Sequence, residues 1–204
     1  MVIDYFCEVG DRISEGIMLD INRLIPYKQE CDWTCSIACL RTIARTIKSE
    51  KDIIEKLGMK PGAYYSDFFY EKYKDDKKYD MLFGCNDTID TVKGTTDWSK
   101  AKAKFTYLCI LLREGYSVMV ESIYNVAHWM VLIGYLPKGT EFCDCEVLLW
   151  DPYLGKYRVE NLEEFIAMWY NGDNVNGIKG DYIAVRLYKV GGLSDEGNSE
   201  GSTT

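Results

Sequence analysis

The chain has 204 residues, a formal net charge of −8 and a single histidine. This length predicts one domain, and a hydrophobic fraction of 47% can supply its core. An acidic balance without a block of Lys and Arg argues against nucleic acid as a partner. The N-terminus lacks a signal-peptide pattern, and no apolar run reaches the roughly 20 residues of a membrane span. We therefore expect a cytoplasmic protein with no membrane partner.

Eight cysteines are many for a chain of this length. Because no signal peptide is indicated, we expect reduced thiols rather than a disulfide framework. Cys143-x-Cys145 lacks the spacing of a zinc site, and no second ligand pair stands at a matching distance. We therefore expect no metal and no cofactor.

In the first half of the chain the elements are mostly helical. Residues 1–24 show no clear period. Apolar residues at three- and four-residue steps predict a helix over 35–47, and a second short helix is expected over 50–57. Residues 62–80, rich in tyrosine, lysine and aspartate, are interpreted as helix plus loop, within an insertion near 58–98.

In the second half the pattern is richer in strands. Strands are predicted over residues 117–122, 128–135, 146–151, 157–159 and 181–190, and helices over residues 100–114 and 161–170. Together the two halves predict an α+β fold in a single domain, 1–190. The tail, 191–204, consists largely of glycine, serine and acidic residues and is expected to be disordered.

The first predicted helix begins with a thiol. Cys35 follows Thr34, which is expected to be the N-cap. A thiol at a helix N-terminus lies at the positive end of the helix dipole, which favours the nucleophilic thiolate. Cys31 precedes the helix, and Cys39 lies one turn further on, where it should face the core. Cys35 is therefore the candidate nucleophile.

Three further residues complete a candidate active site. His128, in a strand-like run, is the only imidazole that can pair with the thiolate and protonate a leaving group. Asp151 ends the next long strand, from which it can orient His128 across adjacent strands. The Gln29 amide, six residues ahead of Cys35, can donate to an oxyanion together with the Cys35 backbone N–H. Each residue alone has an ordinary structural interpretation; their order and spacing together indicate one site.

These residues lie in motifs that resemble a known family. The motifs are Gln29-x5-Cys35-x2-Ala38-Cys39-Leu40, His128-Trp129-Met130-Val131-Leu132-Ile133-Gly134-Tyr135 and Asp151-Pro152. They are similar to the C39-like branch of the papain-like cysteine peptidases, which includes the double-glycine leader peptidases of bacteriocin exporters. The resemblance covers roughly residues 25–47 and 115–190. Trp33-x-Cys35-x2-Ala38-Cys39 also resembles the guanylyl cyclase domain-containing proteins of the same fold.

The resemblance implies a papain-like fold in which a helical half carrying Cys35 packs on an antiparallel sheet carrying His128 and Asp151. It implies the roles of nucleophile, general acid–base and orienting carboxylate for these residues, and of oxyanion donor for Gln29. The chain departs from the family at Ser36, where glycine is usual. It also lacks the membrane spans and ATPase of the exporter peptidases.

The implied activity is a cysteine peptidase-like thiol hydrolase that cleaves a peptide or isopeptide bond through a thioester acyl-enzyme, with a peptide or protein as substrate. Two alternatives stay open: an acyltransferase or deamidase that uses the same site, and a non-catalytic papain-like binding module. The sequence indicates neither the substrate nor the oligomeric state. Gly191-Gly192 resembles the sites that leader peptidases cut, although such a composition is usually an ordinary flexible linker.

Overall fold

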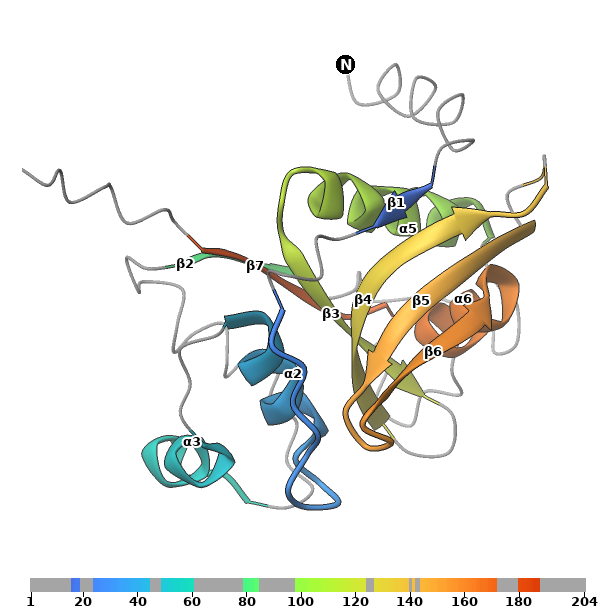
Figure 1. Ribbon diagram of the computed structural model, residues 1–204. Helices are drawn as coiled ribbons and strands as arrows, with labels where there is room; N and C mark the ends of the chain where they lie inside the picture. Colours follow the sequence, from blue (N-terminus) through green and yellow to red (C-terminus); the bar gives the residue numbers. More distant parts are fainter. Residues whose placement is uncertain are drawn as a thin grey trace, which may run out of the picture.

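The chain folds around one antiparallel sheet. The computed structural model describes residues 16–18, 24–44, 49–60, 79–84, 98–123, 127–139, 141, 144–171 and 180–187. Within them a seven-stranded sheet has the order β2-β7-β3-β4-β5-β6, and β1 pairs with β4 (Figure 1). Every described strand pair is antiparallel. The expected α+β class is confirmed.

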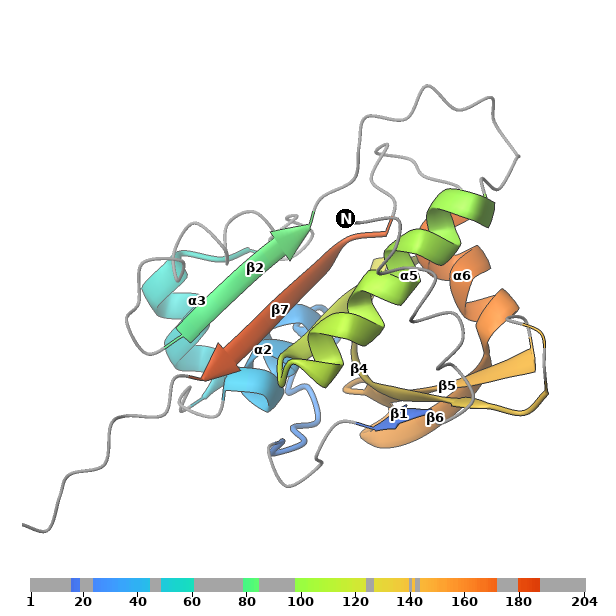
Figure 2. The same cartoon turned by 90° about the horizontal axis from the view of Figure 1, so that it is seen from above.

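Helices lie on both sides of this sheet. The strands are β1 (Ile17–Met18), β2 (Tyr79–Gly84), β3 (Ser117–Ile123), β4 (Ala127–Pro137), β5 (Cys145–Asp151), β6 (Lys156–Asn161) and β7 (Tyr182–Leu187). The described helices are α2 (Cys35–Ala44), α3 (Glu50–Leu57), α5 (Trp98–Arg113) and α6 (Leu162–Asn171). Helix α2 packs on β3, β4 and β7, and α3 packs against α2. Helices α5 and α6 cover the other side (Figure 2).

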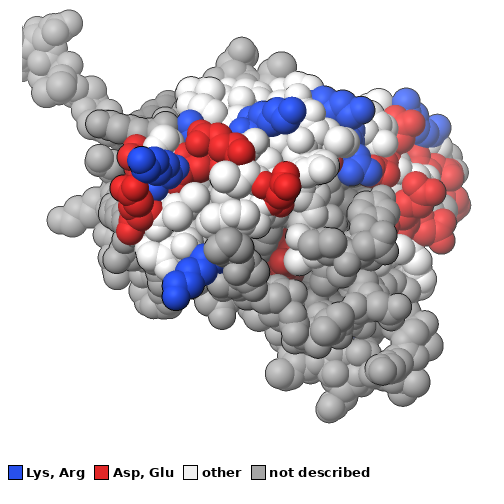
Figure 3. All heavy atoms as spheres, turned by 90° about the horizontal axis from the view of Figure 1, so that it is seen from below, with Lys and Arg blue, Asp and Glu red and all other residues white. Residues whose placement is uncertain are grey.

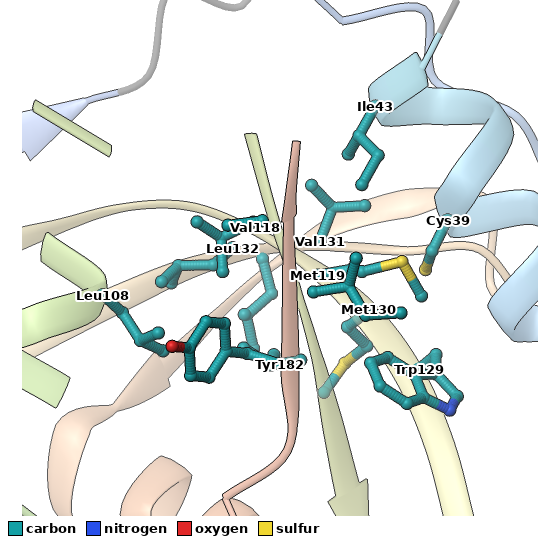
Figure 4. Packing of buried hydrophobic residues seen from close by; sticks show 14 of the residues in the cluster. Cys39, Ile43, Leu108, Val118, Met119, Trp129, Met130, Val131, Leu132 and Tyr182 are labelled. Atoms are coloured by element: carbon teal, nitrogen blue, oxygen red, sulfur yellow. The ribbon is translucent and has the colours of Figure 1, made fainter. Parts of the chain in front are cut away.

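The sheet separates two apolar layers. Leu108 of α5 packs on the side that carries Val118 and Leu132, while Ile43 of α2 lies on the opposite side with Val131 (Figure 4). These five side chains are at most 1% exposed. Because side chains alternate along a strand, neighbouring residues of β4 serve both layers, so this strand reads as an apolar run.

Helix α2 begins at the predicted residue, and α3 both begins and ends as its sequence predicts. Helix α2 is described to Ala44, and the last part of its predicted range, 45–47, lies outside the described residues. Helix α3 begins after Ser49, whose hydroxyl accepts the Asp52 N–H at 3.0 Å. It ends at Gly58, which has the left-handed conformation (φ 63°) that glycine adopts without strain.

Most predicted strands are confirmed, but the first half of the chain holds strands that were not predicted. The interpretation of residues 62–80 as helix plus loop is wrong at its end, because β2 begins at Tyr79. Strand β2 pairs along its length with β7, from Tyr79↔Leu187 to Gly84↔Tyr182. Its partner lies about a hundred residues further on, so only the tertiary fold specifies it. Residues 61–78 and the tail, 188–204, lie outside the described part.

The segment before α2 joins that helix to the distant strand β5. The Tyr27 N–H donates to Thr42 Oγ1 of α2 at 3.1 Å. Trp150 Nε1 of β5 donates to the Tyr27 carbonyl at 3.2 Å, and the Gln29 N–H donates to the Pro152 carbonyl at 2.9 Å. These backbone groups therefore fix the chain leading to Cys35 against the end of β5.

We expect Thr42→Val to destabilise the protein by about 1–3 kcal/mol, because the Tyr27 N–H loses its acceptor. Thr42 Oγ1 also donates to the Ala38 carbonyl at 2.8 Å. Thr106→Val is the matched control, since Thr106 Oγ1 makes the same bond to the Lys102 carbonyl in α5. Urea unfolding measures the loss of stability in each variant. Equal losses in the two variants would contradict the anchoring role of Thr42.

Candidate active site

Cys35 is the first residue of α2 and is partly exposed, whereas the rest of the helix is buried. The Thr34 carbonyl accepts the first helical hydrogen bond, from the Ala38 N–H at 3.0 Å. The Thr34 hydroxyl does not turn to the helix: it accepts the Cys31 N–H at 3.1 Å and donates to the Cys31 carbonyl at 2.8 Å. The Thr34 hydroxyl therefore stabilises the preceding turn and does not cap α2 as the sequence predicted. The N–H groups in the first turn of α2 have no acceptor within the helix, and they point toward its N-terminal end, where Cys35 lies.

Side chains of α2 and α3 contact the turn that precedes α2. The Glu50 carboxylate of α3 accepts the Glu30 N–H at 3.0 Å. Burial raises the pKa of Glu50 above its ordinary value. Arg41 of α2 pairs with Glu30 at 2.9 Å and lies 4.0 Å over the Tyr27 ring. The turn that leads into the thiol is thus fixed by both polar and cation–π contacts.

His128 and Asp151 meet across two neighbouring strands. His128 stands near the start of β4 and Asp151 ends β5, and these strands form an antiparallel pair. His128 Nε2 lies 3.0 Å from Asp151 Oδ1, and their side chains are 23% and 2% exposed. The same carboxylate oxygen accepts the N–H groups of Tyr153 at 2.9 Å and Leu154 at 3.2 Å. The ring orientation is therefore set by a carboxylate that is itself anchored to the turn.

The ionisation of this pair favours charge on both partners. Burial alone would raise the pKa of Asp151, but hydrogen bonds from His128, the Leu154 N–H and Arg158 hold it well below its usual range. Burial opposes a charged imidazole, yet hydrogen bonds with Asp151 and Cys35 raise the pKa of His128 to about 9. The Cys35 thiol is therefore near enough to His128 to favour the charged imidazole. Since Nε2 faces Asp151, Nδ1 is the ring nitrogen left for the thiol.

Gln29 is held beside these residues, but its amide is engaged locally. Its backbone N–H donates to Pro152, the residue after Asp151. Its side-chain Nε2 donates to the Cys31 carbonyl at 2.7 Å. Gln29 Oε1 is buried without a hydrogen-bond partner among the described residues. One of the two Nε2 hydrogens remains for a further acceptor.

Three neighbours of the site were not predicted from the sequence. Arg158 Nη1 donates to Asp151 Oδ2 at 3.1 Å, and Glu160 is the second partner of Arg158. The Tyr153 ring stands edge-on to His128, with ring centres 6.4 Å apart. Arg158 and Glu160 lie on β6, where their alternation with Tyr157 and Val159 resembles that of an ordinary edge strand. A signal was present: opposite charges two residues apart in a short hairpin can share one face.

The described surface and helices add three observations. On the face seen from below, Lys and Arg side chains lie among Asp and Glu side chains (Figure 3). No group of three or more His, Cys, Asp and Glu in the described ranges could hold a metal ion, and Cys143 lies outside those ranges. None of the helices in the described part is both long and apolar enough to cross a membrane.

A family model matches the chain over the same elements. The match is to the Peptidase_C39 like family and covers residues 21–176, which include the described elements from α2 to α6. The chain therefore belongs to this C39-like family of cysteine peptidases. A search of curated proteins gave no significant match.

The raised pKa of His128 predicts how stability depends on pH. A group whose pKa is higher in the folded protein stabilises it fully below the unfolded pKa, about 6.5, and loses this effect as pH rises through about 9. The difference corresponds to about 3 kcal/mol. We expect the unfolding free energy of wild type minus His128→Gln to be largest near pH 6 and to fall toward pH 10, in urea titrations. A constant difference over that range would contradict the ion pair.

Proposed function

We propose that the protein is a cysteine-dependent hydrolase that cleaves a peptide or isopeptide bond through a thioester acyl-enzyme, in a papain-like site. Cys35 is the nucleophile, His128 the general acid and base, Asp151 the orienting carboxylate and Gln29 an oxyanion donor. The observation that carries the proposal is the position of His128, whose Nε2 lies 3.0 Å from Asp151 Oδ1 and whose pKa is raised by both Asp151 and Cys35. Membership of the Peptidase_C39 like family supports the same class of activity.

In the acylation step, the Cys35 thiolate attacks the carbonyl carbon of the scissile bond and the carbonyl oxygen takes the negative charge. The His128 imidazolium then gives its Nδ1 proton to the leaving nitrogen as the C–N bond breaks. A thioester on Cys35 and a free amine result. Asp151 keeps the ring in the orientation that delivers the proton and stabilises the imidazolium before transfer.

The oxyanion of this step needs hydrogen-bond donors. The Cys35 backbone N–H belongs to the first turn of α2, where a helix supplies no acceptor for it. The second Nε2 hydrogen of Gln29 is the other donor. The Cys31 carbonyl and the Pro152 carbonyl fix Gln29 on both sides, so that the amide is oriented before the substrate arrives.

Deacylation returns the site to its starting state. His128, now neutral, removes a proton from water, and the hydroxide formed attacks the thioester carbon. The acid product leaves, the Cys35 thiolate re-forms, and His128 keeps the proton. An amine acceptor in place of water would make the protein an acyltransferase. The chemistry of Cys35 and His128 is identical in both cases.

The nucleophile is tested by iodoacetamide labelling of the native protein with peptide mapping. We expect Cys35 to react at least tenfold faster at neutral pH than the exposed Cys31, because a thiolate is the reacting species. His128→Ala should slow it. Cys31→Ser is the matched control, since Cys31 is exposed and stands four residues earlier, and it should leave the Cys35 rate unchanged. Labelling of Cys35 that is no faster than that of Cys31, with or without His128, would favour the non-catalytic binding module.

The oxyanion role of Gln29 is tested with p-nitrophenyl acetate as a general acyl donor. We expect a burst of p-nitrophenol in wild type, an acetyl group on Cys35 by mass spectrometry, and a burst rate about 10²-fold lower in Gln29→Ala. Asp32→Asn, an exposed neighbour, is the control and should keep the wild-type rate. An unchanged burst in Gln29→Ala would remove Gln29 from the site. Adding a free amine then separates transfer, which yields an acetylated amine, from hydrolysis.

A further inference from the structure

The oxygen of Asp151 that faces away from His128 has its own ionic partner. His128 and two backbone N–H groups share Oδ1, whereas Oδ2 accepts from Arg158 Nη1 at 3.1 Å. The other terminal nitrogen of Arg158 binds Glu160 Oε1. A chain of alternating charge therefore runs from His128 through Asp151 and Arg158 to Glu160.

The strand register explains why these groups meet. In the β5–β6 pair Leu149 lies opposite Arg158, Val147 opposite Glu160, and Asp151 opposite Lys156. Opposed residues and residues two apart share a face, so Asp151 and Arg158 are diagonal neighbours. The side chains of Asp151, Arg158 and Glu160 are 2%, 25% and 12% exposed. Their charges are therefore poorly screened by solvent.

We propose that Arg158 is a positioning residue of the site, and that Arg158 and Glu160 together set how strongly Asp151 holds the protonated form of His128. Arg158 occupies Oδ2, which leaves Oδ1 as the oxygen that orients the ring. Its positive charge offsets part of the carboxylate charge that His128 senses, and Glu160 in turn offsets part of the charge of Arg158. This inference rests on the proposed function, since it concerns the general acid of that reaction.

The balance matters because His128 must release its proton to the leaving group. An imidazolium held too strongly by Asp151 is a poor acid, and one held too weakly does not sustain the thiolate. An ion chain on a hairpin adjusts this balance without touching substrate. The charged and titratable groups described around the His128–Asp151 pair are Cys35 and Cys39 on α2, Tyr153 in the turn, and Lys156, Arg158 and Glu160 on β6; Lys28 packs on Gly155 of the same hairpin.

The test uses the single histidine, whose imidazole signal in proton NMR is unique in the untagged protein. Arg158→Met leaves the bonds of Asp151 to His128, Tyr153 and Leu154 in place but removes one positive charge. We expect the pKa of His128 to rise by about 0.5 to 1 unit. Glu160→Gln removes one negative charge from the far end of the chain, and we expect the pKa to fall by a smaller amount. Arg158→Lys, which keeps the charge, should lie near wild type.

The two substitutions should shift the pKa of His128 in opposite directions. Damage to the hairpin would instead shift this pKa in the same direction in both variants. Loss of the His128–Asp151 bond in either variant would carry the pKa down toward 6.5. Lys156→Met is the matched control: it removes a positive charge from an exposed position on the same strand, and we expect a smaller shift than in Arg158→Met. A common fall in Arg158→Met and Glu160→Gln, or no shift in either, would overturn the inference.

Failure of the inference and failure of the proposed function are distinguishable. The titration needs neither substrate nor acylation. If the two shifts have the expected signs but Cys35 is not alkylated rapidly, the ion chain exists and the hydrolase proposal fails. If Cys35 is alkylated rapidly and acylated, but Arg158→Met and Glu160→Gln leave the pKa of His128 unchanged, the hydrolase proposal stands and Arg158 has no role in the reaction.

Discussion

The arrangement of the site depends on one buried carboxylate. Asp151 accepts hydrogen bonds from His128, from the Tyr153 and Leu154 N–H groups and from Arg158. A buried carboxylate is stable only when its oxygens are paired in this way, because desolvation of an unpaired charge is costly. The same bonds that compensate for its burial fix the orientation of the imidazole. The stability of the hairpin and the orientation of His128 therefore depend on the same hydrogen bonds.

Around that carboxylate the fold joins segments that are far apart in the chain. Helix α2 supplies the thiol, β4 the imidazole and β5 the carboxylate, and the segment before α2 returns to the end of β5 through Gln29 and Pro152. The Thr34 hydroxyl is used by the turn at Cys31 and not by the first turn of α2. In our proposal those helix N–H groups stabilise the thiolate and the oxyanion. The Thr34 hydroxyl thus serves the fold of the turn, while the helix N–H groups stay available for the reaction.

The sequence predicts those parts of the structure that local pattern or strand order determines. Cys35 at a helix start and His128 and Asp151 on neighbouring strands follow from periodicity, and the structure has each of them there. Strand β2 was missed because its pairing with β7 is entirely non-local. Arg158 was missed for a different reason: its contact with Asp151 depends on the register of the hairpin, which a one-residue shift would abolish.

The central claim is that the Cys35 thiolate and the His128 imidazolium form a pair. The most direct test is the NMR titration of His128 in wild type and in Cys35→Ala, with Cys31→Ala as control. Since the Cys35 thiol contributes to the raised pKa of His128, the account predicts a value near 9 in wild type and in the control, and a lower value in Cys35→Ala. The same titration curve in all three proteins would show that thiol and imidazole do not interact, and would contradict the account.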